Sequence, residues 1–259
     1  MTEELFRQDA TLDRCHAQVL AVDAAGVVLD RTVFYPLGGG QAGDAGWLEW
    51  TGGARLAIAD TRKEKDEAGA PTGRILHVPA PDQGELLSKL KPGDAVTAHI
   101  DMPRRRRLMR FHTASHLLCH LVPMPVNGCS ITPEHARIDF HMTGPLDKEA
   151  LTAGLARLVA AGLPVEVGSV TDAELDAHPE LVKSMSVQPP RGSGTVRTIR
   201  IGAALADAER IGAPGGALID LQPCGGTHVT NTAEIGAVVV TKIEKKSAQS
   251  RRVVLGLAD

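Results

Sequence analysis

The sequence has few aromatic residues, few cysteines and no long apolar run. Phe, Trp and Tyr make up 3% of the 259 residues, too few for a ladder of rings that stacks on successive bases of a single strand. The net charge is −3, so the chain as a whole does not attract nucleic acid. Any contact with a polyanion must therefore come from local basic clusters.

The cysteines and the N-terminal residues indicate the compartment. Four cysteines lie at positions 15, 119, 129 and 224 without the spacing of a disulfide framework, which fits a reducing environment. The first residues lack the apolar run of a signal peptide, and no stretch approaches the length that spans a membrane. We therefore expect a cytoplasmic protein, and its 259 residues, with 43% apolar content, predict two globular domains.

A histidine pair stands at helical spacing in a stretch without Gly or Pro, residues 104–122. His112 and His116 are four residues apart, so on a helix over 104–121 both rings leave the same side. The opposite side of this helix carries Ala114, Leu117, Leu118 and Leu121. Two histidines one turn apart are more often solvated or hydrogen-bonded than metal-bound, so the assignment depends on further ligands.

A second pair, Cys224 and His228, supplies those ligands. The glycines Gly225 and Gly226 between them let the backbone turn tightly enough for a thiolate and an imidazole to face one point. In the alternative interpretation Cys224 is a small buried residue and His228 is a surface residue. That interpretation does not explain why two pairs with the same four-residue spacing occur. Three imidazoles and one thiolate suit Zn²⁺, and the sequence predicts a zinc site.

The elements predict an α+β fold in two parts. Residues 1–100 show spaced strands with Gly and Pro turns, typical of a small barrel or sandwich. Their predicted strands are 15–22, 26–30, 47–50, 55–59, 75–78 and 95–101, with a charged loop at 63–67. Residues 101–259 are mixed α/β. They contain predicted helices at 104–121, 147–161 and 172–183, and predicted strands at 131–142, 165–170, 195–201, 217–221, 234–243 and 252–257.

A glycine-rich loop lies in the first part, at residues 38–46. It satisfies G-x-G-x-x-G, but it leads into a strand-like run rather than a helix, which argues against a dinucleotide site. The neighbouring Phe34 and Tyr35 favour a loop of defined shape. We expect this loop to fold over the zinc pocket and to contact substrate through Gly38, Gly39, Gly40, Gln41 and Asp44.

Basic residues gather in two clusters along the sequence. The first comprises Arg104, Arg105, Arg106, Arg107 and Arg110, and the second comprises Lys242, Lys245, Lys246, Arg251 and Arg252. A charge run is usually a solvated face. Because the first cluster adjoins the predicted metal ligands, we instead predict contacts with the phosphates of a folded nucleic acid.

The motifs resemble a known family. Residues 110–116 and 224–228, followed by 231–236, are similar to the editing domain of alanyl-tRNA synthetase and to the free-standing AlaX trans-editing proteins. Residues 136–140 and 251–253 agree in order and rough spacing. The run 34–46 resembles the glycine-rich motif of the medium-sized AlaX proteins, which carry an N-terminal β-barrel domain.

The resemblance implies a β-barrel domain at 1–100 and a zinc-dependent editing domain at 101–259. It also implies a hydrolase that removes serine, and glycine, from mischarged alanine tRNA. The synthetase relationship adds nucleotide binding, ATP binding and alanyl-tRNA aminoacylation to the expected functions. Many synthetase editing domains carry a Gln shortly before the Gly-Ser step after the zinc helix. The corresponding residues 125–130 contain none, so Val126 and Asn127 receive no role by analogy.

The chemistry leaves alternatives open. Zinc can activate water or polarise a carbonyl, yet four protein ligands describe a closed structural site, so the metal's task stays undecided. A pocket that accepts serine over alanine must hydrogen-bond the hydroxyl. The expected catalytic residues are Thr113, Thr227 and Gln41, with Ser115 and Asp44 as further candidates. For Thr113 and Ser115, a bond back to the helix carbonyl four residues earlier is the alternative.

Two other functions compete with the hydrolase. A zinc-stabilised tRNA-binding module would use the same ligands without catalysis. A zinc peptidase would need the Glu of H-E-x-x-H, whereas Thr113 follows His112. The preference between serine and glycine, the oligomeric state and tRNA contact by the N-terminal domain do not follow from the sequence.

Overall fold

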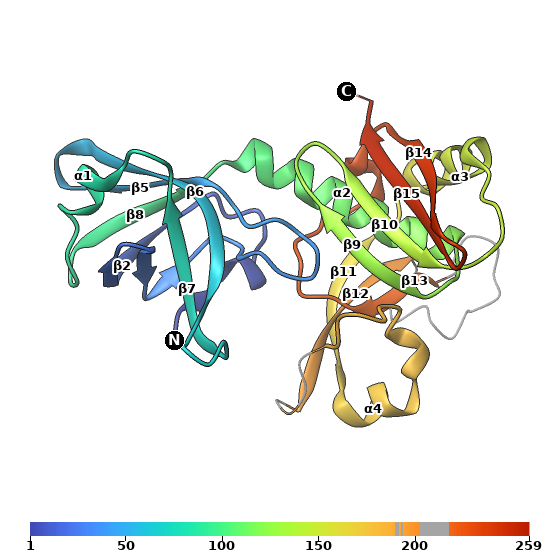
Figure 1. The fold of residues 1–259 in the computed structure, drawn as a ribbon, viewed down its shortest axis with the longest axis horizontal. Helices are drawn as coiled ribbons and strands as arrows, with labels where there is room; N and C mark the ends of the chain where they lie inside the picture. Colours follow the sequence, from blue (N-terminus) through green and yellow to red (C-terminus); the bar gives the residue numbers. More distant parts are fainter. Residues whose placement is uncertain (190–191, 193, 203–217, 259) are drawn as a thin grey trace. The chain divides into compact units, whose positions relative to one another are not determined.

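The structure is a computed structural model that describes residues 1–189, 192, 194–202 and 218–258. The chain divides into two compact units, Met1–Arg106 and Arg107–Asp259. This boundary falls inside helix α2, Met102–Leu121, shortly after the change of character that the sequence shows at residue 101. The architecture is mixed α/β with a barrel near the N-terminus, which confirms the barrel and the mixed α/β character of the predicted fold (Figure 1). No helix among the described residues is long and apolar enough to cross a membrane.

The first unit is a closed barrel of six strands in the order β2-β3-β7-β6-β5-β8. Alternate residues such as Val19, Leu48 and Ala98 point into its core because the strand period is two. Its strands are β2 Arg14–Asp23, β3 Gly26–Leu29, β5 Gly46–Trp50, β6 Ala54–Lys65, β7 Pro71–Pro79 and β8 Ala95–Ile100. A short parallel pair, β1 Glu3–Glu4 with β4 Arg31–Thr32, and helix α1 Gly84–Leu87 complete this unit.

The second unit contains two antiparallel sheets. One has four strands in the order β14-β15-β10-β9, and the other has three in the order β11-β12-β13. The four-stranded sheet comprises β9 Val126–Ile131, β10 Ala136–His141, β14 Val238–Ser247 and β15 Ser250–Leu257. The three-stranded sheet comprises β11 Val165–Thr171, β12 Thr195–Gly202 and β13 Leu218–Pro223. Helix α3 Lys148–Ala160 connects the two sheets, and α4 Asp172–Ala177 lies between β11 and β12 of the three-stranded sheet; Asp147 and Thr171 cap the N-termini of these helices.

Four predicted elements were wrong in extent. The strand predicted at 131–142 is the hairpin β9–β10, whose turn contains Pro133. The helix predicted at 172–183 ends at Ala177 because Pro179 cannot continue it, and a 3-10 turn, Pro179–Leu181, follows. The strand predicted from 234 begins only at Val238, after a 3-10 turn. Part of the charged loop predicted at 63–67 belongs to β6. Residue 217 of the predicted strand 217–221 lies outside the described residues.

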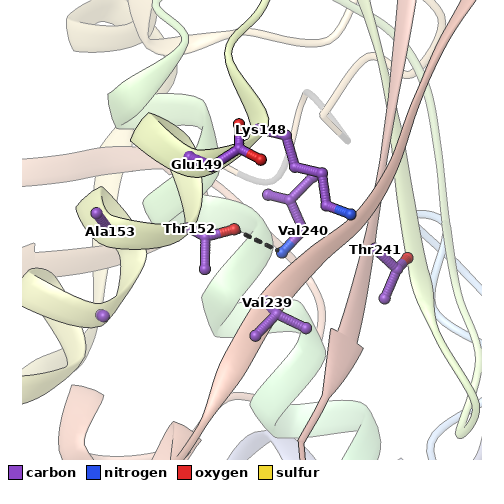
Figure 2. Close-up of a pocket in the computed structure, with 8 residues that line it drawn as sticks. Lys148, Glu149, Thr152, Ala153, Val239, Val240 and Thr241 are labelled. Atoms are coloured by element: carbon purple, nitrogen blue, oxygen red, sulfur yellow. Dashed lines mark hydrogen bonds between the residues drawn. The ribbon is translucent and has the colours of Figure 1, made fainter.

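Helix α3 packs beside the edge strand β14, and a shallow hollow lies between them (Figure 2). The Thr152 hydroxyl accepts a hydrogen bond of 3.2 Å from the backbone N–H of Val240. One donor of the edge strand is therefore satisfied by the helix. The hollow is lined by Lys148, Glu149, Thr152, Ala153, Ala156, Val239, Val240 and Thr241, none of which belongs to the metal-ligand cluster described below.

Candidate metal centre

Helix α2 presents His112 and His116, but not towards solvent. Every residue from Phe111 to Cys119 is buried, so the helix is enclosed on all sides over these turns. The prediction of a helix with one buried Leu stripe was therefore too simple. The histidine side is covered by the turn after β13, which carries Cys224 and His228.

The four predicted ligands converge. One donor atom from each of His112, His116, Cys224 and His228 lies within 4.8 Å of all the others. The Cys224 Sγ is 3.5 Å from His112 Nε2 and 3.3 Å from His228 Nε2. A tetrahedral zinc with bonds of about 2.0–2.3 Å places its nitrogen and sulfur ligands about 3.5 Å apart. The spacing of the donors therefore fits a four-coordinate metal, and this cluster can bind one.

Each of two histidines has a partner behind it that fixes which nitrogen faces the cluster. The Nδ1 of His228 is 3.1 Å from the Thr113 hydroxyl oxygen, which also accepts from the N–H of Val229 at 3.4 Å. The Nδ1 of His116 is 2.7 Å from a carboxylate oxygen of Asp220. In both rings Nε2 is thereby left for the centre, the arrangement that metal-binding histidines use.

The turn that carries Cys224 is held from β12. The guanidinium of Arg197 donates to the carbonyl of Cys224 at 2.6 Å and to that of Gly226 at 3.1 Å. The N–H of Cys224 donates to the Arg197 carbonyl at 3.2 Å. Backbone and side chain of one residue therefore fix the position of the thiol.

The cluster sets unusual protonation states. Burial opposes ionisation of Cys224, but the neighbouring His112 and His228 outweigh it, so the pKa of the thiol lies well below its usual range. Burial, assisted by His112, lowers the pKa of His228 to about 3. Burial acts in the same direction on His116, yet its bond to Asp220 prevails and raises its pKa to about 9. A thiolate and a neutral His228 are the forms that bind metals.

The first basic cluster does not form one surface. Arg105 is fully buried, so it is not available to phosphates, and its prediction as a tRNA contact was wrong. Arg104 donates to the Gly43 carbonyl at 2.6 Å, and Arg107 to the Pro133 carbonyl at 2.8 Å. Arg110 donates to the Ile235 carbonyl at 2.7 Å. Arg106 is exposed.

The second basic cluster is divided in the same way. Arg251 donates to several backbone carbonyls, among them Gly144 at 3.1 Å and Ser247 at 3.0 Å. Arg252 forms an ion pair with Asp139 at 2.7 Å. Lys245 and Lys246 are exposed on β14. These contacts explain why the sequence contains arginines where a backbone carbonyl or carboxylate must be held.

The glycine loop is shaped largely by its own unit. Asp44 is buried, pairs with Arg105 and accepts from the N–H of Tyr35 at 2.6 Å, so its carboxylate holds the loop; its contact with substrate stays a prediction. A Cβ at Gly43 would lie 2.1 Å from the Thr61 carbonyl oxygen, so this glycine is required by packing. The Gly38–Gln41 backbone bridge closes a tight turn, in which Gly39 and Gly40 have φ of 57° and 84°. The Gln41 side chain is buried.

The hydroxyls near the ligands have distinct environments. Thr113 lies behind His228, as described above, and not in the bond to a helix carbonyl that was its alternative. Ser115 does make that bond, to the carbonyl of Phe111 at 2.8 Å. Thr227 is buried beside the ligand His228.

Sequence comparison identifies the family. A family profile described as "Threonyl and Alanyl tRNA synthetase second additional domain" matches residues 196–254, and one described as "tRNA synthetases class II (A)" matches residues 7–104. The chain is 31% identical over 257 residues to the alanyl-tRNA editing protein AlaX-M of Saccharolobus solfataricus, with 98% of both chains covered. It is 33% identical over 268 residues to AlaX-M of Methanosarcina barkeri, with 100% of both covered.

An alanine–tRNA ligase of Saccharolobus islandicus is 30% identical over 257 residues, but the match covers 25% of the ligase. Full-length coverage of the free-standing proteins, together with the two-unit fold, places the chain in the class of tRNA-editing proteins. It belongs to the AlaX-M family of alanyl-tRNA editing proteins.

The sequence analysis missed the residues behind the ligands. Asp220 and Gln222 contact His116 Nδ1, and Lys183 contacts Asp220; none of the three was predicted. A signal was present for one of them. Asp220 is a single acidic residue in an otherwise apolar stretch, Leu218–Leu221, directly before a ligand turn. A charge in such a strand requires a buried partner.

Proposed function

We propose that the protein is a zinc-dependent deacylase that removes serine, and secondarily glycine, from mischarged alanine tRNA. The observation that carries this proposal is the convergence of three imidazoles and one thiolate in a chain that aligns along its full length with alanyl-tRNA editing proteins. Zinc binds nitrogen and sulfur donors such as these, whereas hard cations such as Mg²⁺ prefer oxygen donors.

Some residues of the proposed centre bind the metal or the substrate, and others position the metal ligands. When bound, zinc supplies a Lewis-acid centre that orients and polarises an ester or lowers the pKa of a water. Thr113 positions His228 through its Nδ1. Thr227, buried beside His228, is the hydroxyl that we assign to contact with the substrate, and a serine side chain is the group it would hydrogen-bond.

The tRNA is held by exposed cations rather than by whole clusters. Arg106, Lys245 and Lys246 are exposed and suit phosphate oxygens. Arg104, Arg107, Arg110 and Arg251 already donate to backbone carbonyls, so their main role is structural. ATP or dinucleotide binding is not part of the proposal, because the glycine loop leads into strand β5 and opens no helix.

Deacylation assays test the proposal. Alanine tRNA charged with serine, glycine or alanine is incubated with the protein, with and without a chelator. We expect release of serine fastest, glycine next and alanine least, and loss of all release after zinc removal. Retained tRNA binding with no release from any substrate would instead support the non-catalytic tRNA-binding module.

A further inference from the structure

Asp220 lies directly behind the ligand cluster and has a hydrogen-bond donor at each oxygen. His116 Nδ1 is 2.7 Å from its Oδ2, and the Lys183 ammonium contacts its Oδ1. The Gln222 amide donates to Oδ2 at 2.8 Å. The Asp220 side chain is fully buried, whereas that of Lys183 is 24% exposed. A carboxylate in this position is costly unless it is paired, and here it is paired throughout.

The backbone fixes both partners independently of the metal ligands. Asp220 lies opposite Ile201 in the ladder between β12 and β13. The carbonyl of Lys183 accepts from the N–H of Val126 at 2.8 Å, and the N–H of Met185 donates to the Val126 carbonyl at 2.9 Å. Lys183 is thus held against β9 of one sheet and Asp220 within the other, so their side chains meet at a predetermined point.

An ionised carboxylate can only accept hydrogen bonds. His116 must therefore carry a proton on Nδ1 when it contacts Asp220, and Nε2 is the nitrogen that faces Cys224 and His228, where it would offer its lone pair once a bound ion has displaced its proton. We propose that Asp220, held by Lys183, is the positioning residue of the metal centre and sets its affinity for the ion. This inference rests on the metal centre of the proposed function but not on deacylation.

Lys183 acts through Asp220 and also balances its charge. A zinc ion with one thiolate and three neutral imidazoles carries a formal charge of +1, and the Asp220–Lys183 pair adds none. Loss of Lys183 leaves a carboxylate that still accepts from His116, so the ion affinity should fall less than after loss of Asp220. A double variant should then bind the ion no more weakly than the Asp220 variant alone.

Metal-binding measurements on the full chain test this inference. Zinc dissociation constants are obtained by competition with a chromophoric chelator, and cobalt(II) absorption reports the ligand geometry. Asp220→Asn should weaken zinc binding by about tenfold or more and alter the cobalt spectrum. Lys183→Met should weaken it less. Asp139→Asn is the matched control, because Asp139 pairs with Arg252 and Arg137 elsewhere in the same unit, and it should bind zinc like the parent.

Several results would overturn the inference. An Asp220→Asn protein with the parent zinc affinity and cobalt spectrum would do so, as would a loss as large in Asp139→Asn. A parent protein that binds no metal would overturn the metal centre itself, whereas a parent that binds zinc but deacylates nothing would leave the inference standing. Where Asp220→Asn does not fold, ¹⁵N NMR of the parent's histidines decides. A proton on Nδ1 of His116 supports the inference, and an Nδ1 without a proton overturns it.

Discussion

Arg105 and Asp44 form an ion pair that is sealed inside the first unit. The guanidinium Nε lies 3.0 and 2.9 Å from the two carboxylate oxygens, and the exposed fractions of the two side chains are 0% and 1%. The remaining N–H groups donate to the carbonyls of Ala10 at 2.8 Å and Val33 at 2.7 Å. One arginine therefore joins the end of the barrel to the N-terminal segment and the glycine loop.

Breaking this pair should destabilise the protein strongly. Arg105→Ala leaves the Asp44 carboxylate buried without its partner, which typically costs about 3–5 kcal/mol. Arg106→Ala, at the exposed neighbouring position, should change the free energy of unfolding by less than about 0.5 kcal/mol. Urea titrations of the two variants measure the difference. Equal midpoints would mean that the pair contributes little to folding.

The exposed cations should govern the salt dependence of tRNA binding. Replacing Arg106, Lys245 and Lys246 by Gln should weaken binding and reduce the slope of log K against log salt by about 0.7–0.9 for each phosphate that is no longer neutralised. A matched variant changes the exposed lysines Lys63, Lys89 and Lys91 of the first unit, and its slope should equal that of the parent. If both variants keep the slope of the parent, the three cations do not contact phosphates and form only a solvated face.

Cys224→Ala should lose the metal and the deacylation of Ser-tRNA together, because the only thiolate of the predicted ligand set is removed. Cys129→Ala is the control. Burial raises the pKa of Cys129 to about 12, so it is a protonated thiol with no part in the ligand set. Metal content by atomic emission and initial rates of serine release provide the measurements. Full metal stoichiometry in Cys224→Ala would exclude it as a ligand.

Stability should fall in mild acid because of His77. Its Nδ1 lies 3.0 Å from the Val27 carbonyl and donates to it, and its Nε2 lies 2.8 Å from the Thr32 hydroxyl, from which the neutral ring accepts. Burial lowers its pKa to about 4 from an ordinary 6.5. The stability that the neutral ring contributes is complete above pH 6.5 and is lost as the pH falls towards 4.

The expected loss is about 2–3 kcal/mol over that range. Urea unfolding of the parent and of His77→Gln between these pH values measures it, because glutamine preserves polar contacts without titrating. The parent should lose more stability than the variant. Parallel curves for the two proteins would contradict the assignment.

Substitutions in the glycine loop test its predicted contact with substrate. Gln41→Ala should slow the removal of serine by an amount equivalent to roughly 1 kcal/mol, with metal content and tRNA affinity unchanged. Gly39 has a φ of 57°, and a Cβ there meets no described atom within 4 Å. Gly39→Val should therefore disturb the loop through backbone strain alone, and Gly39→Asn should be tolerated. Parent rates in Gln41→Ala and Gly39→Val would make the loop a connector.

Spacing along the chain was sufficient to predict the two residue pairs that form the cluster, because each pair is local. His112 with His116 and Cys224 with His228 are each four residues apart, and local geometry brings each pair to one side. The same reasoning could not find Asp220 or Lys183, whose contacts join residues 104 and 37 positions apart. Nor could it separate Arg105 from Arg106. They are adjacent and chemically identical, and only Asp44, 61 residues away, decides which of them is buried.

The separation between the two ligand pairs has a mechanical consequence. Cys224 and His112 are 112 positions apart, so a bound ion joins chain segments that only the folded structure brings together. The ion is then a reversible cross-link, and like a disulfide it restricts the unfolded chain by closing a long loop. Because the ligands must be deprotonated to hold it, this cross-link opens in acid and in chelator. If the proposed zinc centre forms, the temperature at which the second unit melts should therefore rise with the free zinc concentration around the protein.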